Sequence, residues 1–141
     1  MDSEDDFNEY WSQLKGILSN RVIESAVKFR MIQDFCEKNE DRVELNQIEE
    51  KAVEKLCIGI VIAGDFKLTL RESMNKIIHS TSAEIAIVEE DIDGKSSHFW
   101  NGNFSLKGKH NKTTWHLDLH INPWARAVTK YLDSLNSSEK I

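Results

Sequence analysis

Residues 113–121 read TTWHLDLHI, and this stretch decides the fold class that the sequence predicts. Apolar and polar side chains alternate along it. The apolar positions are Trp115, Leu117, Leu119 and Ile121, and the polar positions are His116, Asp118 and His120. A period of two is typical of a β-strand that buries one face and exposes the other. We therefore expect a strand over residues 113–121 that packs on the hydrophobic core through Trp115.

Two further strands are expected just before this one, because residues 84–89 and 98–106 also have strand-like alternation. The DIDG sequence at residues 91–94 ends in Asp-Gly, which is a hairpin-turn signal. We interpret residues 107–112 as a polar six-residue loop. Residues 83–121 are therefore predicted to form a three-stranded antiparallel meander.

Helical spacing dominates the N-terminal part of the chain. Ser3 suits an N-cap, and we expect one helix up to Leu18, a break at Ser19-Asn20 and a second helix over residues 21–38. The side chains expected to face the core from these two helices are Phe7, Tyr10, Trp11, Leu14, Ile17, Leu18, Ile23, Ala26, Val27, Phe29, Ile32, Phe35 and Cys36.

The middle of the chain is less clearly patterned. Asn46 is expected to cap a third helix, with Glu49 three residues later. Residues 57–63 suit either a buried strand or a continuation of that helix, and we favour the helix running on part of the way. A hairpin through Gly64-Asp65 into residues 66–70 is a third possibility. A short helix is expected over residues 71–79.

A final helix is expected over residues 122–136, where Asn122 is a suitable cap and Pro123 fits the first helical position. Its inward side chains would be Trp124, Val128, Tyr131, Leu132 and Leu135. The predicted fold class is therefore α+β, with N-terminal helices packed on the meander and a C-terminal helix closing it. Residues 1–141 are expected to form a single domain, mainly helical over residues 1–82.

Composition suits a globular protein of the cytoplasm, with 141 residues that are 40 % hydrophobic and 30 % charged. The longest apolar run, residues 57–63, is far shorter than the ~20 residues that a membrane span needs. The N-terminus is acidic, whereas a signal peptide begins with positive charge. We expect Cys36 and Cys57 to be buried thiols in a reducing compartment.

Charge is distributed unevenly. Residues 1–57 carry 14 acidic and 8 basic side chains, a net charge of −6, whereas residues 58–141 carry 10 of each. No basic stripe is present, so we expect neither a nucleic-acid partner nor a membrane partner. An acidic surface can instead steer a basic protein toward it. Glu4 and Asp5 are therefore candidate contacts to such a partner.

The outer face of the predicted meander carries the candidate binding patch. A six-residue loop at residues 107–112 would place Phe104 opposite Trp115 on the core side. On the outer side it would place Asn103 opposite His116, Asn101 opposite Asp118, and Phe99 opposite His120. Such a mixture of amides, imidazoles, a carboxylate and an aromatic ring suits a hydrogen-bonding protein interface.

The histidines also raise the question of a metal. His116 and Asp118 are about 6.8 Å apart along a strand, but His116 and His120 are about 13.5 Å apart and cannot share an ion. We therefore expect no metal ion, no other cofactor and no catalytic residue. A small metal-dependent hydrolase, with Asp118 orienting a histidine and His116 taking a proton, remains an alternative.

A short motif near the C-terminus adds a family resemblance: Trp115-His116-x-Asp118-Leu119 on a strand, then a helix with Tyr131, Leu132 and Ser134-Leu135. This segment resembles the C-terminal end of some bacterial immunity proteins. These are small acidic cytoplasmic α+β proteins that neutralise toxins of contact-dependent growth inhibition and related systems. The resemblance implies a non-catalytic inhibitor that binds a cognate toxin, frequently a nuclease. An acidic secretion chaperone, usually a homodimer, is a second possibility. The candidate partner-binding residues are Asn101, Asn103, His116, Asp118, His120, Glu4 and Asp5.

Overall fold

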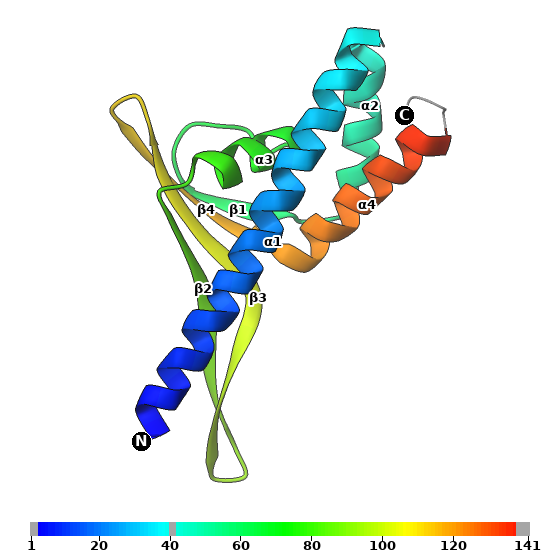
Figure 1. Ribbon diagram of the computed structural model, residues 1–141. Coiled ribbons are helices and arrows are strands. Elements are labelled where there is room, and N and C mark those ends of the chain that lie inside the picture. Colours follow the sequence, from blue (N-terminus) through cyan, green and yellow to red (C-terminus); the bar gives the residue numbers. More distant parts are fainter. Residues whose placement is uncertain (1–2, 40–41, 138–141) are drawn as a thin grey trace.

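The computed structural model describes residues 3–39 and 42–137. In chain order the elements are α1 (Ser3–Asn39), α2 (Arg42–Val53), β1 (Gly59–Ala63), α3 (Leu70–His79), β2 (Ser82–Ile92), β3 (Lys95–His110), β4 (Thr113–His120) and α4 (Ile121–Ser137). The strands form one antiparallel sheet in the order β1-β4-β3-β2. The α+β class is confirmed, but the β2–β3–β4 meander gains a fourth strand, β1, beside β4 (Figure 1).

Strand β4 forms as predicted. Trp115, Leu117 and Leu119 are buried in the core, while the residues between them are only partly buried. The strand ends at His120 because α4 begins at once with Ile121. The predicted boundary is within one residue, but Asn122 is not the cap, because Asn122 and Pro123 both lie inside the first turn of α4.

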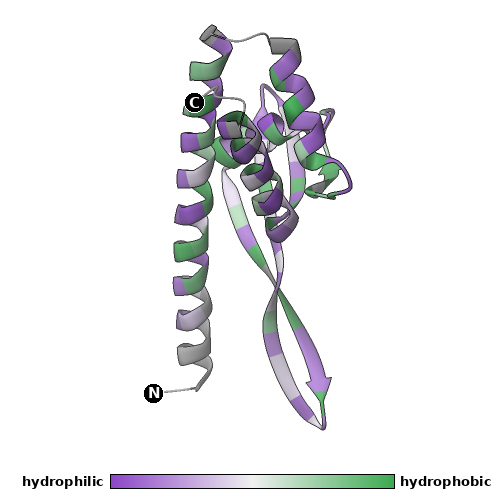
Figure 2. Cartoon of the chain, turned by 90° about the vertical axis from the view of Figure 1, so that its right-hand side faces the viewer, coloured by the Kyte–Doolittle hydropathy of each residue, from purple (hydrophilic) through white to green (hydrophobic). Residues whose placement is uncertain are grey.

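The hairpin between β2 and β3 turns at Asp93-Gly94, as predicted. Both residues have positive φ, 53° and 76°, which is the backbone that a two-residue hairpin turn requires. Both strands are longer than predicted, and Figure 1 shows the tip of this hairpin extending well away from the rest of the sheet. The N-terminal end of α1 points in the same direction in Figures 1 and 2.

The predicted six-residue loop at residues 107–112 is wrong. Strand β3 continues to His110, and the turn is the two-residue Asn111-Lys112, with Asn111 at φ 57°. Gly108, which favoured a loop in the sequence, instead lies opposite Trp115. A Cβ at position 108 would lie 2.5 Å from Cζ2 of Trp115, so the glycine makes room for the indole ring.

The predicted register between the last two strands is wrong for the same reason. Phe104 lies opposite Leu119, and Leu106 opposite Leu117, because the turn is four residues shorter than expected. An even shift preserves the faces of a strand, since side chains alternate with a period of two. The predicted core side of the meander is therefore retained, although each pairing differs.

Helix α1 is one continuous helix, so the predicted break at Ser19-Asn20 is wrong. Both residues have weak helix propensity, but neither removes a backbone donor, and tertiary packing overrides such weak preferences. Ala26, Phe29 and Cys36 are buried as predicted. The inward positions that prove to be exposed are Tyr10, Ile17, Ile23, Val27 and Phe35. The side chains of Phe7 and Trp11 lie outside the described residues.

Residues 42–79 depart from the prediction in two places. Helix α2 begins at Arg42, so Asn46 lies inside it and is not its cap. The favoured helical continuation into residues 57–63 is wrong, because Lys55 adopts a φ of 65° and the β-branched residues that follow form β1 at the sheet edge. The third possibility, a hairpin into residues 66–70, is wrong as well, since no strand forms there. The short helix α3 forms as predicted, with Thr69 as its N-cap.

One hydrophobic core joins the helices to the inner face of the sheet. Helix α4 contributes Trp124, Ala127, Tyr131 and Leu135, all buried. The Trp124 indole nitrogen donates to Ser73 Oγ of α3 at 2.9 Å, so its polar atom is satisfied within the core. Cys36 is buried as expected, but Cys57 is exposed, which contradicts the prediction for that thiol.

Candidate functional site

The predicted patch lies on the face of the sheet that points away from the helices. His116 and Asp118 of β4 are partly buried there, with Ser105 of β3 opposite Asp118. The Ser105 hydroxyl and His116 Nε2 are 2.7 Å apart and share a hydrogen bond. Asp118 Oδ2 lies 3.9 Å from Nε2 of His120, so its carboxylate approaches that imidazole. The Nδ1 atom of His120 lies 3.3 Å from the backbone oxygen of Cys57, which ties the patch to the start of β1.

The two asparagines occupy different positions from those predicted. Asn103 lies opposite His120 and not opposite His116, as a consequence of the corrected register. Asn101 lies in an irregular part of β3, where the pairing with β2 shifts between Ile85 and Ile87. Its side-chain oxygen accepts from the backbone N–H of Asn103 at 3.0 Å, beside Gly102 at φ 89°. The patch therefore gathers Asn103 with the β4 residues, whereas Asn101 supports the bulge.

Other predicted contacts lie elsewhere. Phe99 lies opposite Val88 on the long β2–β3 hairpin and not opposite His120. Glu4 and Asp5 belong to the first turns of α1, and their side chains lie outside the described residues. The predicted patch and the predicted acidic contacts are thus separate features of the chain.

Ser105 is the residue of this patch that sequence reasoning missed. A hydroxyl hydrogen-bonded to an imidazole is the pairing that activates a serine nucleophile when a third group orients the base. Among the contacts of the described residues, the Asp118 carboxylate approaches His120 and no acidic group orients His116. Reading the turn as two residues long would have placed Ser105 beside Asp118 from the sequence alone.

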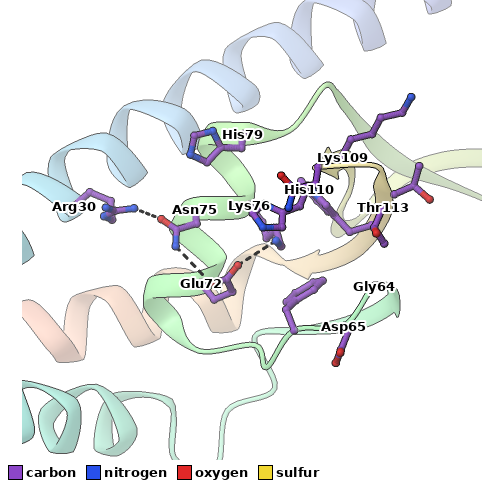
Figure 3. Close-up of a pocket in the computed structure, with 14 residues that line it drawn as sticks. Arg30, Gly64, Asp65, Glu72, Asn75, Lys76, His79, Lys109, His110 and Thr113 are labelled. Carbon is purple, nitrogen blue, oxygen red and sulfur yellow. Dashed lines mark hydrogen bonds and ion pairs between the residues drawn. The ribbon is translucent and has the colours of Figure 1, made fainter.

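A pocket of about 890 Å³ lies elsewhere, between α1, α3, the segment after β1 and the β3–β4 turn (Figure 3). At its base the Lys76 ammonium lies 4.4 Å from the Phe66 ring centroid and 4.9 Å from that of Trp115. Both contacts are cation–π interactions. The same ammonium forms an ion pair with Glu72 at 3.1 Å, so it contacts one carboxylate and two aromatic rings.

The rest of the pocket wall is rich in nitrogen donors. Arg30 of α1 donates to the side-chain oxygen of Asn75, whose amide nitrogen in turn donates to Glu72 at 3.4 Å. Figure 3 shows this chain of contacts running from α1 across α3 to Lys76. Further lining residues come from the end of α3 and from the β3–β4 turn: His79, Lys109, His110, Thr113 and Thr114. Sequence reasoning did not find this pocket, because its residues are scattered over four segments.

A third feature is an apolar surface on α1, which we call the outer stripe: Tyr10, Ile17, Val27, Met31 and Phe35. At 100° per residue these positions lie on the side of the helix opposite Val22, Ala26 and Phe29, which are buried. Met31 is 67 % exposed and Ile17 is 61 % exposed. Figure 2 shows hydrophobic residues recurring along the length of α1. The helix is therefore apolar on two sides, and the core covers one of them.

Residues 3–39 and 42–137 contain neither a metal-binding cluster nor a membrane-spanning helix. No group of three or more His, Cys, Asp and Glu side chains is arranged there to hold a metal ion. No helix in that part of the chain is both long enough and apolar enough to cross a membrane. Comparison of the chain with known protein families, with characterised proteins and with solved structures finds no match.

Proposed function

We propose that the protein is a non-catalytic binding protein, and specifically an immunity protein that neutralises a cognate toxin by direct contact. The observation that carries the proposal is the outer stripe of α1. A helix that is apolar on two sides has more apolar surface than its own core covers, and exposed apolar side chains that group on one face of a small protein, here Val27, Met31 and Phe35, mark an interaction site. An amphipathic helix that lies in a groove of its partner is a recurring mode of recognition.

The size of the stripe supports a specific complex. Complete burial of a Met, Ile or Phe side chain contributes ~1.5–3 kcal/mol, so covering the exposed half of each contributes on the order of 1 kcal/mol. Helix α1 has 37 residues and is therefore about 55 Å long at 1.5 Å per residue. Such a length allows one partner to contact several members of the stripe at once.

Charge supports a basic partner. The net charge of −6 lies entirely in residues 1–57, which include α1 and α2. A toxin that cuts nucleic acid needs a basic surface to hold phosphates, and an acidic inhibitor can occupy that surface. Glu4 and Asp5 would act at the rim, where charges mainly change the rate of association.

The outer sheet patch supplies a second candidate surface. His116, Asp118 and His120 lie there beside Ile60 and Ile62 of β1, both about half exposed. This patch faces away from the helices, whereas the outer stripe faces away from the sheet. One small partner cannot cover both, so substitutions on the two surfaces separate them.

The test is co-expression with candidate toxins, beginning with the products of genes that neighbour the gene of this chain, followed by binding kinetics at two salt concentrations for a toxin that the chain neutralises. Met31→Asp should weaken binding roughly tenfold or more, because about 1.4 kcal/mol of buried apolar contact is lost and a charge is desolvated. Asn136→Asp adds the same charge at an exposed position of α4, outside the stripe, and should leave binding unchanged. Reversal of Glu4 and Asp5 to lysine should slow association and reduce its salt dependence.

The results of these experiments distinguish the outer sheet patch from the outer stripe as the interface, and they test the immunity function itself. If the patch is the interface, replacement of Asn103, His116 or Asp118 by alanine raises the dissociation rate and Met31→Asp does not. If the chain fails to protect cells from the toxin, or if every variant binds as the parent does, the immunity proposal is wrong.

A secretion chaperone is the second candidate, and the outer stripe favours it too, because two copies could pair through α1. The mass in solution distinguishes the two functions. A chain of 16.3 kDa that remains monomeric supports the inhibitor, and a stable dimer that Met31→Asp dissociates supports the chaperone.

A hydrolase is the third candidate, and the hydrogen bond between Ser105 and His116 is the observation that favours it. A metal-dependent reaction through His116 and Asp118 would require stoichiometric metal in protein purified without a histidine tag. A serine-dependent reaction would require labelling of Ser105 by a fluorophosphonate, lost in Ser105→Ala and reduced in His116→Ala.

A further inference from the structure

We propose that Asn101 is a site of spontaneous covalent modification, at which the side-chain amide is converted to a carboxylate through a cyclic imide formed with Gly102. This inference is independent of the outer stripe and of the proposed immunity function. It rests on the sequence of this dipeptide, on its position in β3 and on the hydrogen bond that the Asn101 side chain accepts.

The reaction takes place between two neighbouring residues of the same chain. The backbone nitrogen of Gly102 attacks Cγ of Asn101, and the new C–N bond closes a five-membered ring, which is favoured because both groups belong to one chain. The bond between Cγ and Nδ2 breaks, and ammonia leaves with the proton that the Gly102 nitrogen has lost. Water then opens the ring at either of its two carbonyl groups, which gives aspartate or isoaspartate at position 101.

The glycine at position 102 makes the attack sterically easy. Asn101 is the only asparagine of the chain that a glycine follows. A glycine has no Cβ, so nothing on this residue crowds the attacking nitrogen. Gly102 has a φ of 89°, and apart from its chain neighbours no residue places an atom within 4 Å of the position that a Cβ would occupy. The surroundings therefore leave room for the ring.

The dipeptide also lies at a break in the pairing of β3. The register with β2 shifts between Ile85 and Ile87, and the pairing with β4 begins only at Asn103. Among the described residues, Asn101 and Gly102 therefore have no register partner in either neighbouring strand. A regular ladder holds the backbone extended and restrains such a ring closure, and this restraint is weaker here. Asn101 is also exposed, so water reaches it.

The hydrogen bond of Asn101 prepares the amide for the attack. The backbone N–H of Asn103 donates to Oδ1 of Asn101 at 3.0 Å. Negative charge develops on this oxygen when the Gly102 nitrogen attacks Cγ, and an N–H at such a distance stabilises that charge. A bond from the residue two positions ahead also turns the side chain back along its own backbone, as in an Asx turn. The contact that supports the bulge therefore favours the reaction as well.

Conversion changes the protein where β3 leaves the sheet and enters the long hairpin (Figure 1). Isoaspartate carries the main chain through its Cβ, so it lengthens β3 by one backbone atom. The Trp100 indole nitrogen donates to the backbone oxygen of Asn103 at 2.8 Å, across the modified position. An added backbone atom between these two residues should disturb that contact. Normal aspartate keeps the backbone and an acceptor oxygen, and it adds only a negative charge.

The experiment is incubation of the full chain at mildly alkaline pH, followed by peptide mapping with a fragmentation method that distinguishes aspartate from isoaspartate. Asn111 is the matched control, because it is exposed and has a φ of 57° in a turn, but Lys112 follows it. We expect both products at position 101, formed at least about tenfold faster than any product at position 111. Equal rates at the two positions, or an unchanged Asn101, would overturn the proposal.

The same incubation in guanidinium chloride separates the role of the fold from that of the sequence. We expect Asn101 of the folded chain to convert within about tenfold of the rate in the unfolded chain, because the break in the pairing leaves this backbone mobile. A larger slowing in the folded chain would mean that β3 protects the dipeptide, and it would overturn the assignment.

Thermal unfolding tests the predicted change in β3. The isoaspartate form, separated by chromatography, should unfold at a lower temperature than the parent. The Asn101→Asp variant has the same added charge on a normal backbone, and it should unfold close to the parent. A shared unfolding temperature for the isoaspartate form and Asn101→Asp would contradict the predicted effect of the longer backbone.

Discussion

Helices α1 and α4 are both rich in apolar residues, but they use them differently. In α4, Trp124, Tyr131 and Leu135 lie on one side and all are buried. In α1, Ala26 and Phe29 are buried on one side while Ile17 and Met31 are exposed on the other. The packing of this chain thus buries the inward apolar residues of α4 and leaves Ile17, Val27 and Met31 of the outer stripe exposed.

This difference between the two helices indicates which surface is a candidate for a functional contact. An apolar residue on the core face of a helix is explained by packing, whereas a row of them on the opposite face needs another reason. The outer stripe is such a row in two parts, because the exposed Glu24–Lys28 ion pair lies on the same face between Ile17 and Met31. The comparison therefore predicts that truncation of a side chain to alanine lowers the free energy of unfolding more on the buried side of α4 than on the outer stripe of α1.

The largest expected effect is on stability. Leu135→Ala on α4 should lower the free energy of unfolding by ~2–5 kcal/mol, because a fully buried leucine leaves a cavity. Met31→Ala on α1 should change it by less than about 0.5 kcal/mol, because this side chain is exposed. Urea denaturation of both variants measures the difference. A large loss for Met31→Ala would mean that the outer stripe stabilises the fold of the single chain.

Substitution of two glycines by alanine should change the stability of the protein in opposite directions in the sheet and in α1. Gly108→Ala should destabilise the protein by ~1–3 kcal/mol, because the new methyl group would overlap the Trp115 ring. Gly16→Ala on α1 should instead stabilise it by ~0.5–1 kcal/mol, because nothing lies within 4 Å of the new Cβ and alanine favours a helix. Thermal unfolding of the two variants should shift in opposite directions, and a shared direction would contradict this packing.

The smallest expected effect concerns pH. Burial raises the pKa of Tyr131 above its ordinary value of 10.0, although the hydrogen bond from Gln33 opposes the shift. Above pH 10 the unfolded chain then loses this phenolic proton before the folded chain does, so stability should fall as pH rises beyond that value. Tyr131→Phe should remove that part of the alkaline decrease, measured as unfolding free energy between pH 8 and pH 11. An unchanged alkaline slope would show that Tyr131 does not contribute to it.

The strands and the last helix could be predicted because their patterns are local. Strict alternation identified β4, and a single apolar stripe identified α4. Strand β1 could not be predicted in the same way, because the helical periodicity of α2 can continue through this apolar run and its pairing with β4 spans more than fifty residues of chain. The turn at Asn111-Lys112 was missed because a glycine is typical of a loop, whereas Gly108 lies in a strand and makes room for the Trp115 ring.

The candidate sites also divide into features that a local sequence pattern predicts and features that depend on contacts between distant segments. The β4 side of the patch was identified from its alternation, but Ser105 depended on the register and was missed. The pocket depends on contacts between α1, α3 and the β3–β4 turn, which no local pattern encodes. The outer stripe was present in the sequence, yet the same residues were assigned to the core, because periodicity identifies apolar positions but does not say which face is covered.

The central claim is that the outer stripe of α1 binds a cognate toxin, and site-specific photo-crosslinking tests it most directly. A photoreactive phenylalanine derivative replaces Met31 of α1 in one protein and Lys130, an exposed residue of α4, in another. In cells that also produce a toxin that the chain neutralises, the account predicts an adduct with that toxin at position 31 and none at position 130. No adduct at position 31, the same adduct at both positions, or an adduct between two copies of this chain would contradict it.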